Sequence, residues 1–171
     1  VVQKNNRVQS PVAGVSRRKG TSSNRVKLTS DDLATAKNFG IDITDSDGHT
    51  MRMDIPVAQG GNGSGFRPMQ SLLAALCGCS AVDVVSILKK QKQVLEGLEI
   101  EVDGNREEGK EPSLWKHIDI RFHLTGNIEP AKGYRAVDLS LEKYCSVAET
   151  LRMAGAQIVF HVFVNGQEVT A

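Results

Sequence analysis

The chain has 171 residues, of which 40% are hydrophobic and 24% are charged, a composition that indicates one globular domain and excludes a wholly disordered or fibrous protein. Its net charge of +1 gives it no bulk attraction to nucleic acid or to an anionic membrane, so we expect small partners that are neutral or weakly charged. No uninterrupted apolar run approaches the roughly 18 residues that a membrane span needs, so we expect a soluble protein without a membrane partner.

The first 40 residues are basic, because no Asp or Glu precedes Asp31. We interpret residues 1–40 as a basic N-terminal arm or edge strand with a solvated face, ahead of a single domain at 41–171. One alternative is the remnant of an organelle-targeting segment, which would also be rich in Arg and Ser and poor in acids. A nucleic-acid-binding arm ranks last, because the segment has no interleaved aromatic residues and no known binding motif.

In chain order, the domain begins with a predicted hairpin at 41–56, where apolar residues alternate on both sides of a turn at 45–48. The Gly-rich segment 59–65 follows, and we expect it to be a flexible loop. A long helix then begins at Pro68, a first-turn position that tolerates the missing N–H of proline, and runs to about Lys90. Because this helix is apolar nearly all round, we expect it to be central and buried.

Strands are predicted at 98–102 and, from a stronger alternation, at 115–124, with a charged turn between them. A second helix begins at 129–130 and bends near Cys145 before it ends, and a closing strand covers 157–164. The order of strands, long helix, strands, helix pair and strand predicts an α+β fold.

Three cysteines in a chain of this size do not resemble a disulfide scaffold, which favours a reducing compartment and a cytoplasmic location. Cys77 and Cys79 diverge by about 200° around the helix, so they cannot bind one ion, and no second Cys/His pair has zinc-finger spacing. We therefore expect no metal and no cofactor. Cys77 is interpreted as a small buried hydrophobe.

Cys79 and Cys145 have more distinctive surroundings. Gly78 and Ser80 flank Cys79 with little bulk and leave room for a substrate at the sulfur. Cys145 lies where the second helix restarts, and a helix N-terminus favours a thiolate. A redox pair and two buried structural thiols are both compatible with this spacing.

Three histidines occupy the predicted strands, and their parity places them on a sheet face: His117, His123 and His161. The alternative is a Cys–His nucleophile arrangement, which would need one of them beside Cys79.

Two motifs resemble those of the OsmC/Ohr family, the osmotically inducible and organic-hydroperoxide-resistance proteins. The segment Leu139–Ala148 is similar to the second cysteine motif of that family. The similarity extends from about residue 41 to about residue 166. The first motif, which resembles the family's central helix, is carried by Gly60, Gly61, Pro68, Leu72–Cys79 and Ala81–Val85.

The resemblance implies an OsmC-like fold in which antiparallel sheets wrap a long central helix, within an intertwined homodimer that has two active sites at its interface. It assigns Cys79 as the peroxidatic thiol and Cys145 as the resolving thiol. The implied reaction is the reduction of an organic hydroperoxide, or of a small electrophile, through a sulfenic acid and a disulfide. A thiol or dithiol reductant would restore the pair, and the implied partners include no nucleic acid.

The chain also departs from the family pattern. Well-studied members have a glutamate about ten residues before the first cysteine that holds an arginine against the thiolate, and here Met69 and Gln70 occupy that place. Arg52 and Arg67 are the candidate arginines. The departure places the chain with the less characterised OsmC-like proteins and implies weak peroxidase activity. It also leaves open a non-catalytic module that binds a small ligand or senses redox state.

Overall fold

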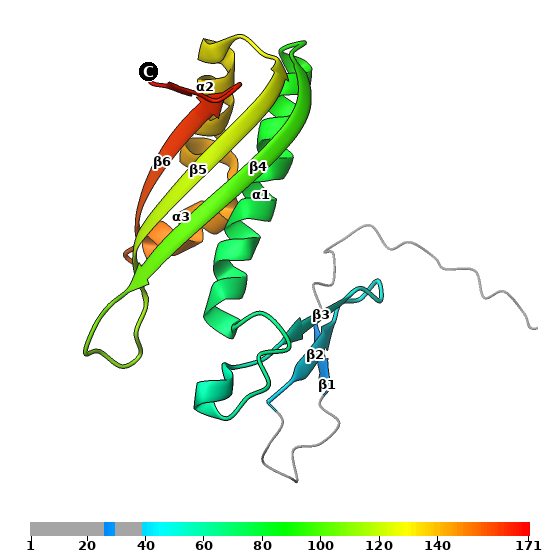
Figure 1. Ribbon diagram of the computed structural model, residues 1–171, viewed down its shortest axis with the longest axis vertical. Coiled ribbons are helices and arrows are strands. Elements are labelled where there is room, and N and C mark those ends of the chain that lie inside the picture. Colours follow the sequence, from blue (N-terminus) through cyan, green and yellow to red (C-terminus); the bar gives the residue numbers. More distant parts are fainter. Residues whose placement is uncertain (1–25, 30–38) are drawn as a thin grey trace, which may run out of the picture.

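The computed structural model describes residues 26–29 and 39–171, which form two β-sheets and a group of helices (Figure 1). Most of the basic segment 1–40 lies outside these residues, so its interpretation as an arm or edge strand ahead of a domain at 41–171 stays a prediction. The predicted α+β class is confirmed.

The smaller sheet has three antiparallel strands in the order β1 (Lys27–Thr29), β2 (Ile41–Thr44) and β3 (Thr50–Met53). The predicted hairpin is confirmed, with β2 and β3 as its arms. The Asp45 carboxylate holds the turn by accepting two backbone N–H hydrogen bonds of 2.9 Å. The sheet lies beyond the N-terminal end of the long helix, apart from the larger sheet (Figure 1).

The Gly-rich segment 59–65 has a defined path in the structure, and its expected flexibility stays a prediction. It folds back over Asp54, which is 2% exposed and accepts four hydrogen bonds. A side chain at Gly61 would clash with the carbonyl of Ile55, so close packing of the loop requires this glycine. The four donors are the backbone N–H groups of Ile55 (2.7 Å), Asn62 (3.2 Å) and Ser64 (3.0 Å) and the hydroxyl of Ser64 (2.7 Å).

The larger sheet has the strand order β4 (Val94–Arg106), β5 (Trp115–Asn127), β6 (Gln157–Val164) and β7 (Gln167–Val169). Strands β5 and β6 are parallel and the other pairs are antiparallel, so the expectation of antiparallel sheets was wrong for this one. The parallel pair arises because the chain crosses over through helices between β5 and β6.

Two of the predicted strands, 115–124 and 157–164, are confirmed, and the first of them continues to Asn127. The strand predicted at 98–102 extends further at both ends, because β5 pairs with it along its whole length. A side chain at Gly104 would lie 2.8 Å from the Trp115 ring, so this glycine lets the indole cover the strand.

The predicted long helix is confirmed as α1 (Pro68–Lys90), with proline in its first turn. It is buried on one side only, where it packs against β4 and the other helices. The opposite side exposes apolar residues, so the expectation of a fully buried helix was wrong for this chain by itself. The buried side contains Leu73, Leu76, Val84 and Leu88, and the exposed residues include Leu72 (41%), Val82 (68%) and Val85 (45%).

By length and composition α1 could also cross a membrane, with a mean hydropathy of 2.0 in an 18-residue window. Our count of uninterrupted apolar residues did not detect this property. The core helix of a soluble protein passes the same test. Packing against β4 accounts for the apolar residues on one side of the helix, and 28% of the window is buried.

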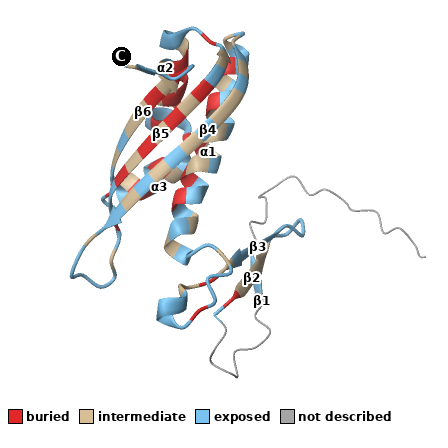
Figure 2. Ribbon diagram, viewed as in Figure 1, coloured by how far each residue is buried: buried red, intermediate tan, exposed pale blue. Residues whose placement is uncertain are grey.

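The second helical segment consists of α2 (Pro130–Leu139), the π-helical turn η3 (Ser140–Tyr144) and α3 (Ser146–Met153). The predicted bend is confirmed at Cys145, which is extended, with φ −72° and ψ 100°. These helices and α1 cover the same face of the larger sheet (Figure 1). Figure 2 shows the buried residues on the strand and helix surfaces that meet there.

We predict that Asp54 stabilises its loop only while its carboxylate is ionised. Its four hydrogen bonds lower its pKa from 3.8 to about 2, so the stabilisation is fully present above about pH 4 and is lost as the pH falls through 2. NMR titration of the Asn62 and Ser64 amide shifts should give a midpoint near 2. Removing one donor in Ser64→Ala should raise the midpoint, and a wild-type midpoint near 4 would contradict the prediction.

Candidate thiol site

Three side chains meet where the middle of α1 packs against the break between η3 and α3. Cys79 and Asp83 lie four residues apart on one side of α1, and Cys145 is the residue at the break. The two sulfur atoms and a carboxylate oxygen of Asp83 all lie within 4.8 Å of one another. The fold therefore brings together two cysteines that are far apart in the sequence.

Cys145 is a buried thiol, 2% exposed, that caps the N-terminus of α3. The backbone N–H of Ala148 donates a hydrogen bond of 3.4 Å to its Sγ, which favours the thiolate as the sequence suggested. Burial outweighs this effect and, together with the neighbouring Cys79, raises the pKa of Cys145 to about 11. Cys145 is therefore a protonated thiol at neutral pH.

Asp83 is held by a serine from the π-helical turn. The hydroxyl of Ser140, which is fully buried, donates a hydrogen bond of 3.1 Å to Oδ2 of Asp83. The Ser140 Oγ also lies 3.4 Å from the carbonyl oxygen of Ser80 on α1. The turn that ends at Cys145 is thus attached to the part of α1 that carries Cys79 and Asp83.

Cys79 is partly buried and lies at the border between the two sides of α1. It packs against the core on one side. On the other side, Ala75 and Val82, which share its helix face by spacing, are exposed and apolar. The Cys79 sulfur is therefore the more accessible of the two thiols that meet here.

Cys77 faces elsewhere, as the divergence of the two α1 cysteines predicts. It lines an apolar pocket of about 420 Å³ together with Phe66, Leu73 and Val102. Burial raises the pKa of its thiol, although the residue is only partly buried in this chain. The two cysteines of the Cys-x-Cys sequence therefore do not share a site.

Neither candidate arginine reaches the sulfur atoms within this chain. Arg52 pairs with Asp42 at 3.0 Å on the smaller sheet and donates to Ser64. In the part of the chain that the structure describes, no hydrogen bond or ion pair joins an arginine to Cys79 or Cys145. The described residues therefore give the thiols no arginine partner of the kind that lowers a cysteine pKa in many redox proteins.

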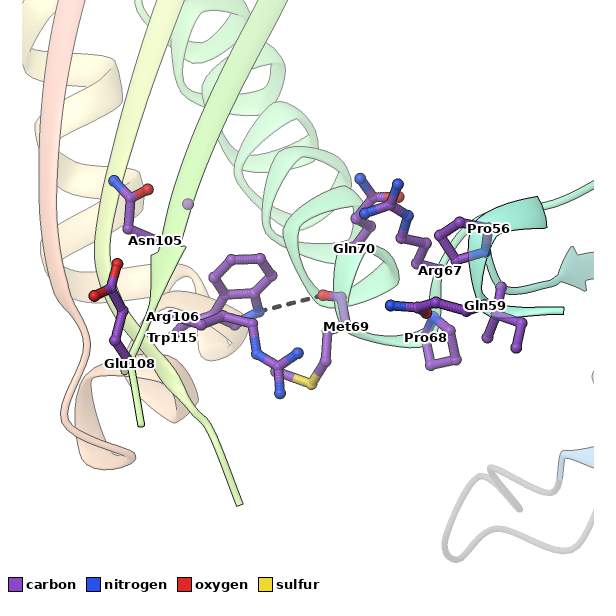
Figure 3. A pocket seen from close by; sticks show the side chains of 12 residues that line it. Pro56, Gln59, Arg67, Pro68, Met69, Gln70, Asn105, Arg106, Glu108 and Trp115 are labelled. Atoms are coloured by element: carbon purple, nitrogen blue, oxygen red, sulfur yellow. Dashed lines mark hydrogen bonds between the residues drawn. The ribbon is translucent and has the colours of Figure 1, made fainter. Parts of the chain in front are cut away.

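Arg67 instead lines a pocket of about 680 Å³ at the first turn of α1 (Figure 3). Met69 and Gln70, at the place of the family glutamate, line the same pocket. Figure 3 shows the Trp115 indole donating a hydrogen bond to the Met69 carbonyl, at 3.2 Å. Ten residues of helix span about 15 Å, so Met69 lies far along α1 from Cys79 and the pocket contains no thiol.

The three strand histidines lie on the outer face of the larger sheet. His123 stacks on Phe163 with 4.7 Å between ring centroids, and His161 lies 2.9 Å from a Glu168 carboxylate oxygen. His117 is exposed. Since the thiols lie on the side of the sheet that the helices cover, these positions argue against a Cys–His nucleophile.

Two groups of described residues bring three possible metal ligands within 4.8 Å of one another. One group is Cys79, Asp83 and Cys145. It offers three ligands to a soft divalent ion, and the fourth tetrahedral position of that ion would stay open. The other is the exposed hairpin turn at 45–49, where local hydrogen bonds already account for the geometry. The sequence did not suggest the first group, because only the fold brings Cys145 to α1.

Asp83 is the site residue that sequence reasoning missed. It is the only carboxylate in α1, and it lies in an otherwise apolar segment four residues after a cysteine. A charged residue on the core side of a helix needs a partner, which was a usable signal. Nothing in the sequence indicated that Ser140 would contact Asp83, because the position of Ser140 depends on the π-helical turn.

Comparison with known proteins gives a consistent result. A model of the OsmC-like protein family matches residues 61–160. The protein YhfA of Escherichia coli K12 is 48% identical over 88 residues, which cover 51% of this chain and 65% of that protein, a little under two thirds of its length.

Solved structures resemble most of the chain. A hypothetical protein from Aquifex aeolicus VF5 is 29% identical with a TM-score of 0.68, over 85% of this chain and 99% of that one. An organic hydroperoxide resistance protein OsmC from Legionella pneumophila is 18% identical with a TM-score of 0.64, over 85% and 100% of the two chains. At 18% identity the likeness concerns the fold.

We predict that iodoacetamide modifies Cys145 at least about tenfold more slowly than Cys79 at pH 7.5, because Cys145 is 2% exposed and its pKa is about 11. Mass spectrometry of timed, quenched samples measures both rates. Protein denatured in urea, in which the two rates should converge, is the control. Equal rates in the folded protein would contradict the burial of Cys145.

Proposed function

We propose that this chain, which belongs to the OsmC-like protein family and shares its fold, reduces organic hydroperoxides through Cys79 and Cys145. The observation that carries the proposal is the approach of the two sulfur atoms to within 4.8 Å from distant parts of the sequence. Several proteins of the same fold are named organic hydroperoxide resistance proteins, which supports the substrate class.

Exposure and protonation divide the roles between the two thiols. The more accessible Cys79 attacks the terminal peroxide oxygen, which breaks the O–O bond, releases an alcohol and leaves a sulfenic acid. The buried, protonated Cys145 then condenses with that sulfenic acid to a disulfide and releases water. The sulfur atoms must move from within 4.8 Å to a bond of about 2.05 Å.

Local structure allows this movement. Cys145 lies between a π-helical turn and an α-helix, in an extended conformation. π-helical turns are less regular than α-helix and often occur at functional sites. A shift of η3 can therefore carry Cys145 toward Cys79 without moving the core helix.

Two surfaces give the hydroperoxide and the reductant access to the thiols. Apolar residues of α1 next to Cys79 suit the organic part of a hydroperoxide, at the edge of the surface that a second copy would cover. A pocket of about 530 Å³ reaches Cys145 and is lined in part by Leu141 and Tyr144, which gives a thiol or dithiol reductant access to the disulfide.

We also propose that the protein is a homodimer joined along α1. The exposed side of α1 is apolar over several turns, and the three-stranded sheet lies apart from the body of the chain (Figure 1). A small sheet without a packing partner is marginally stable in water, and a large exposed apolar surface indicates an interface. A second copy that pairs α1 with α1 would cover both features.

A second candidate function is a redox sensor that forms the disulfide without efficient turnover. The observation that favours it is the lack of an arginine at the two sulfur atoms among the described residues, which should make the reaction slow. Turnover separates the two functions, because a sensor consumes about one equivalent of peroxide per protein even when excess reductant is present.

We predict that one equivalent of cumene hydroperoxide converts the reduced protein to a Cys79–Cys145 disulfide, since the two thiols are adjacent. Disulfide mapping by mass spectrometry measures it. Cys79→Ser should abolish peroxide consumption, Cys145→Ser should leave a sulfenic acid that dimedone traps, and Cys77→Ser should behave as wild type. Undiminished consumption by Cys79→Ser would remove the proposal.

We predict that Val82→Glu weakens dimerisation at least about tenfold, because a charge would be buried in the α1–α1 interface. Analytical ultracentrifugation over a concentration series measures it. The matched control is Val159→Glu on β6, a valine of similar exposure (55% against 68%) far from α1. A monomeric wild type would show the dimer proposal to be incorrect.

A further inference from the structure

Given the proposed peroxide reduction, on which this inference rests, we propose that Asp83 is the acid–base residue of the site. Its carboxylate removes the proton from Cys79 as the sulfur attacks, and later removes the proton from Cys145. In each half of the cycle it returns the proton to the oxygen that leaves.

The position of Asp83 suits this role. One of its carboxylate oxygens lies within 4.8 Å of both sulfur atoms, so either thiol can reach it through a small rotation or one water molecule. It shares a side of α1 with Cys79, one helical turn away. A single carboxylate between two thiols can therefore serve both steps.

Ser140 fixes the orientation of the carboxylate. It donates to Oδ2, and no other hydrogen bond to Asp83 is found among the described residues. The hydroxyl of the neighbouring Ser80 donates instead to the carbonyl of Leu76, at 2.6 Å. One side of the carboxylate is thus held by η3, and the remaining lone pairs can accept a thiol proton.

The negative charge of Asp83 favours removal of the thiol proton during the attack, and it disfavours a thiolate that exists before the peroxide arrives. A cation next to a cysteine stabilises the thiolate before the peroxide arrives, whereas a carboxylate repels it. Asp83 therefore cannot replace the family arginine in that function. A carboxylate can instead accept the proton during the attack, so that no two adjacent negative charges persist.

The other charged side chains on α2, η3 and α3, the helical elements that pack against α1, do not bind Asp83. Glu149 lines the pocket that reaches Cys145, but it is exposed on the surface of α3. The acidic and basic side chains of α2, η3 and α3 form pairs with one another or with their neighbours, and none is found on Asp83. These pairs are Lys132 with Glu129, Arg135 with Asp138, Arg152 with Glu142, and Lys143 over the Tyr144 ring.

The protons and electrons balance over the two steps. In the first, the Cys79 sulfur loses two electrons to the peroxide as the O–O bond breaks, and Asp83 passes the Cys79 proton to the departing alkoxide, which leaves as an alcohol. In the second, the Cys145 sulfur displaces hydroxide from the sulfenic acid, and Asp83 passes the Cys145 proton to the hydroxide, which leaves as water. Asp83 ends each step ionised.

Cys145 shows why a base is needed. Its pKa of about 11 means that very little thiolate exists at neutral pH. Cys145 is 2% exposed, so its sulfur has little contact with bulk water. Asp83 lies close enough to receive the Cys145 proton as the disulfide forms.

The test is the pH dependence of disulfide formation in Asp83→Asn, with cumene hydroperoxide in single-turnover experiments on the full chain from pH 6 to 8. We expect a wild-type rate that changes little with pH. The variant should be about 100-fold slower at pH 7, and its rate should rise about tenfold per pH unit because solvent must remove the proton. Asp83→Glu should recover part of the rate.

Asp103→Asn on the outer face of β4 is the matched control, since Asp103 pairs only with the surface residue Arg121 among the described residues, and it should behave as wild type. An Asp83→Asn variant with the wild-type rate, or with a slower rate but an unchanged pH profile, would overturn the role of Asp83 while peroxide reduction by the wild type stands. A wild type that forms no disulfide with peroxide would instead end the proposed function.

Discussion

The thiol site depends on the packing of the middle of α1 against the break at Cys145. The Ser140 hydroxyl joins the two elements at that point, through hydrogen bonds to the Asp83 carboxylate and to the carbonyl of Ser80, and the core of the larger sheet lies behind them. The π-helical turn that carries Ser140 also ends the helix in time for Cys145 to cap the next one. The sulfur atoms meet because a turn of irregular helix, a cap and a buried polar contact all occur within six residues of the chain.

The two sides of α1 explain much of the rest. One side is apolar because it covers β4, and the other is apolar and stays exposed among the described residues. Cys79 and Asp83 lie near the border between the sides, and Cys145 meets them from the buried side. Pairing of two such helices would place an apolar wall beside each thiol, and the same surface would then stabilise the protein and exclude water from the reaction.

The elements that the sequence predicted well are those with local signals. Each of these signals lies within the element that it predicts. They are the proline at the start of α1, the alternation of apolar residues in β5 and β6, and the turn after β2. Contacts between distant residues caused the errors. Pairing with β5 lengthened β4, and the crossover made the sheet mixed. The hydrogen bonds from the Gly-rich loop to Asp54 also had no signal in the sequence. Asp83 was overlooked for the same reason, since its partners come from the far end of the chain.

The replacement of the family glutamate by Met69 has a physical meaning in this setting. Among the described residues no cation pairs with the sulfur atoms, and burial together with the neighbouring Cys79 disfavours the thiolate of Cys145. If Asp83 acts as proposed, reactivity depends on proton transfer at the moment of attack, and the thiols would be protected from oxidation until a substrate is bound. Such a site would react slowly with most oxidants and faster with an oxidant that binds beside α1. In the proposed reaction, the apolar part of an organic hydroperoxide would lie against the apolar residues beside Cys79 while its oxygen atoms meet Cys79 and Asp83.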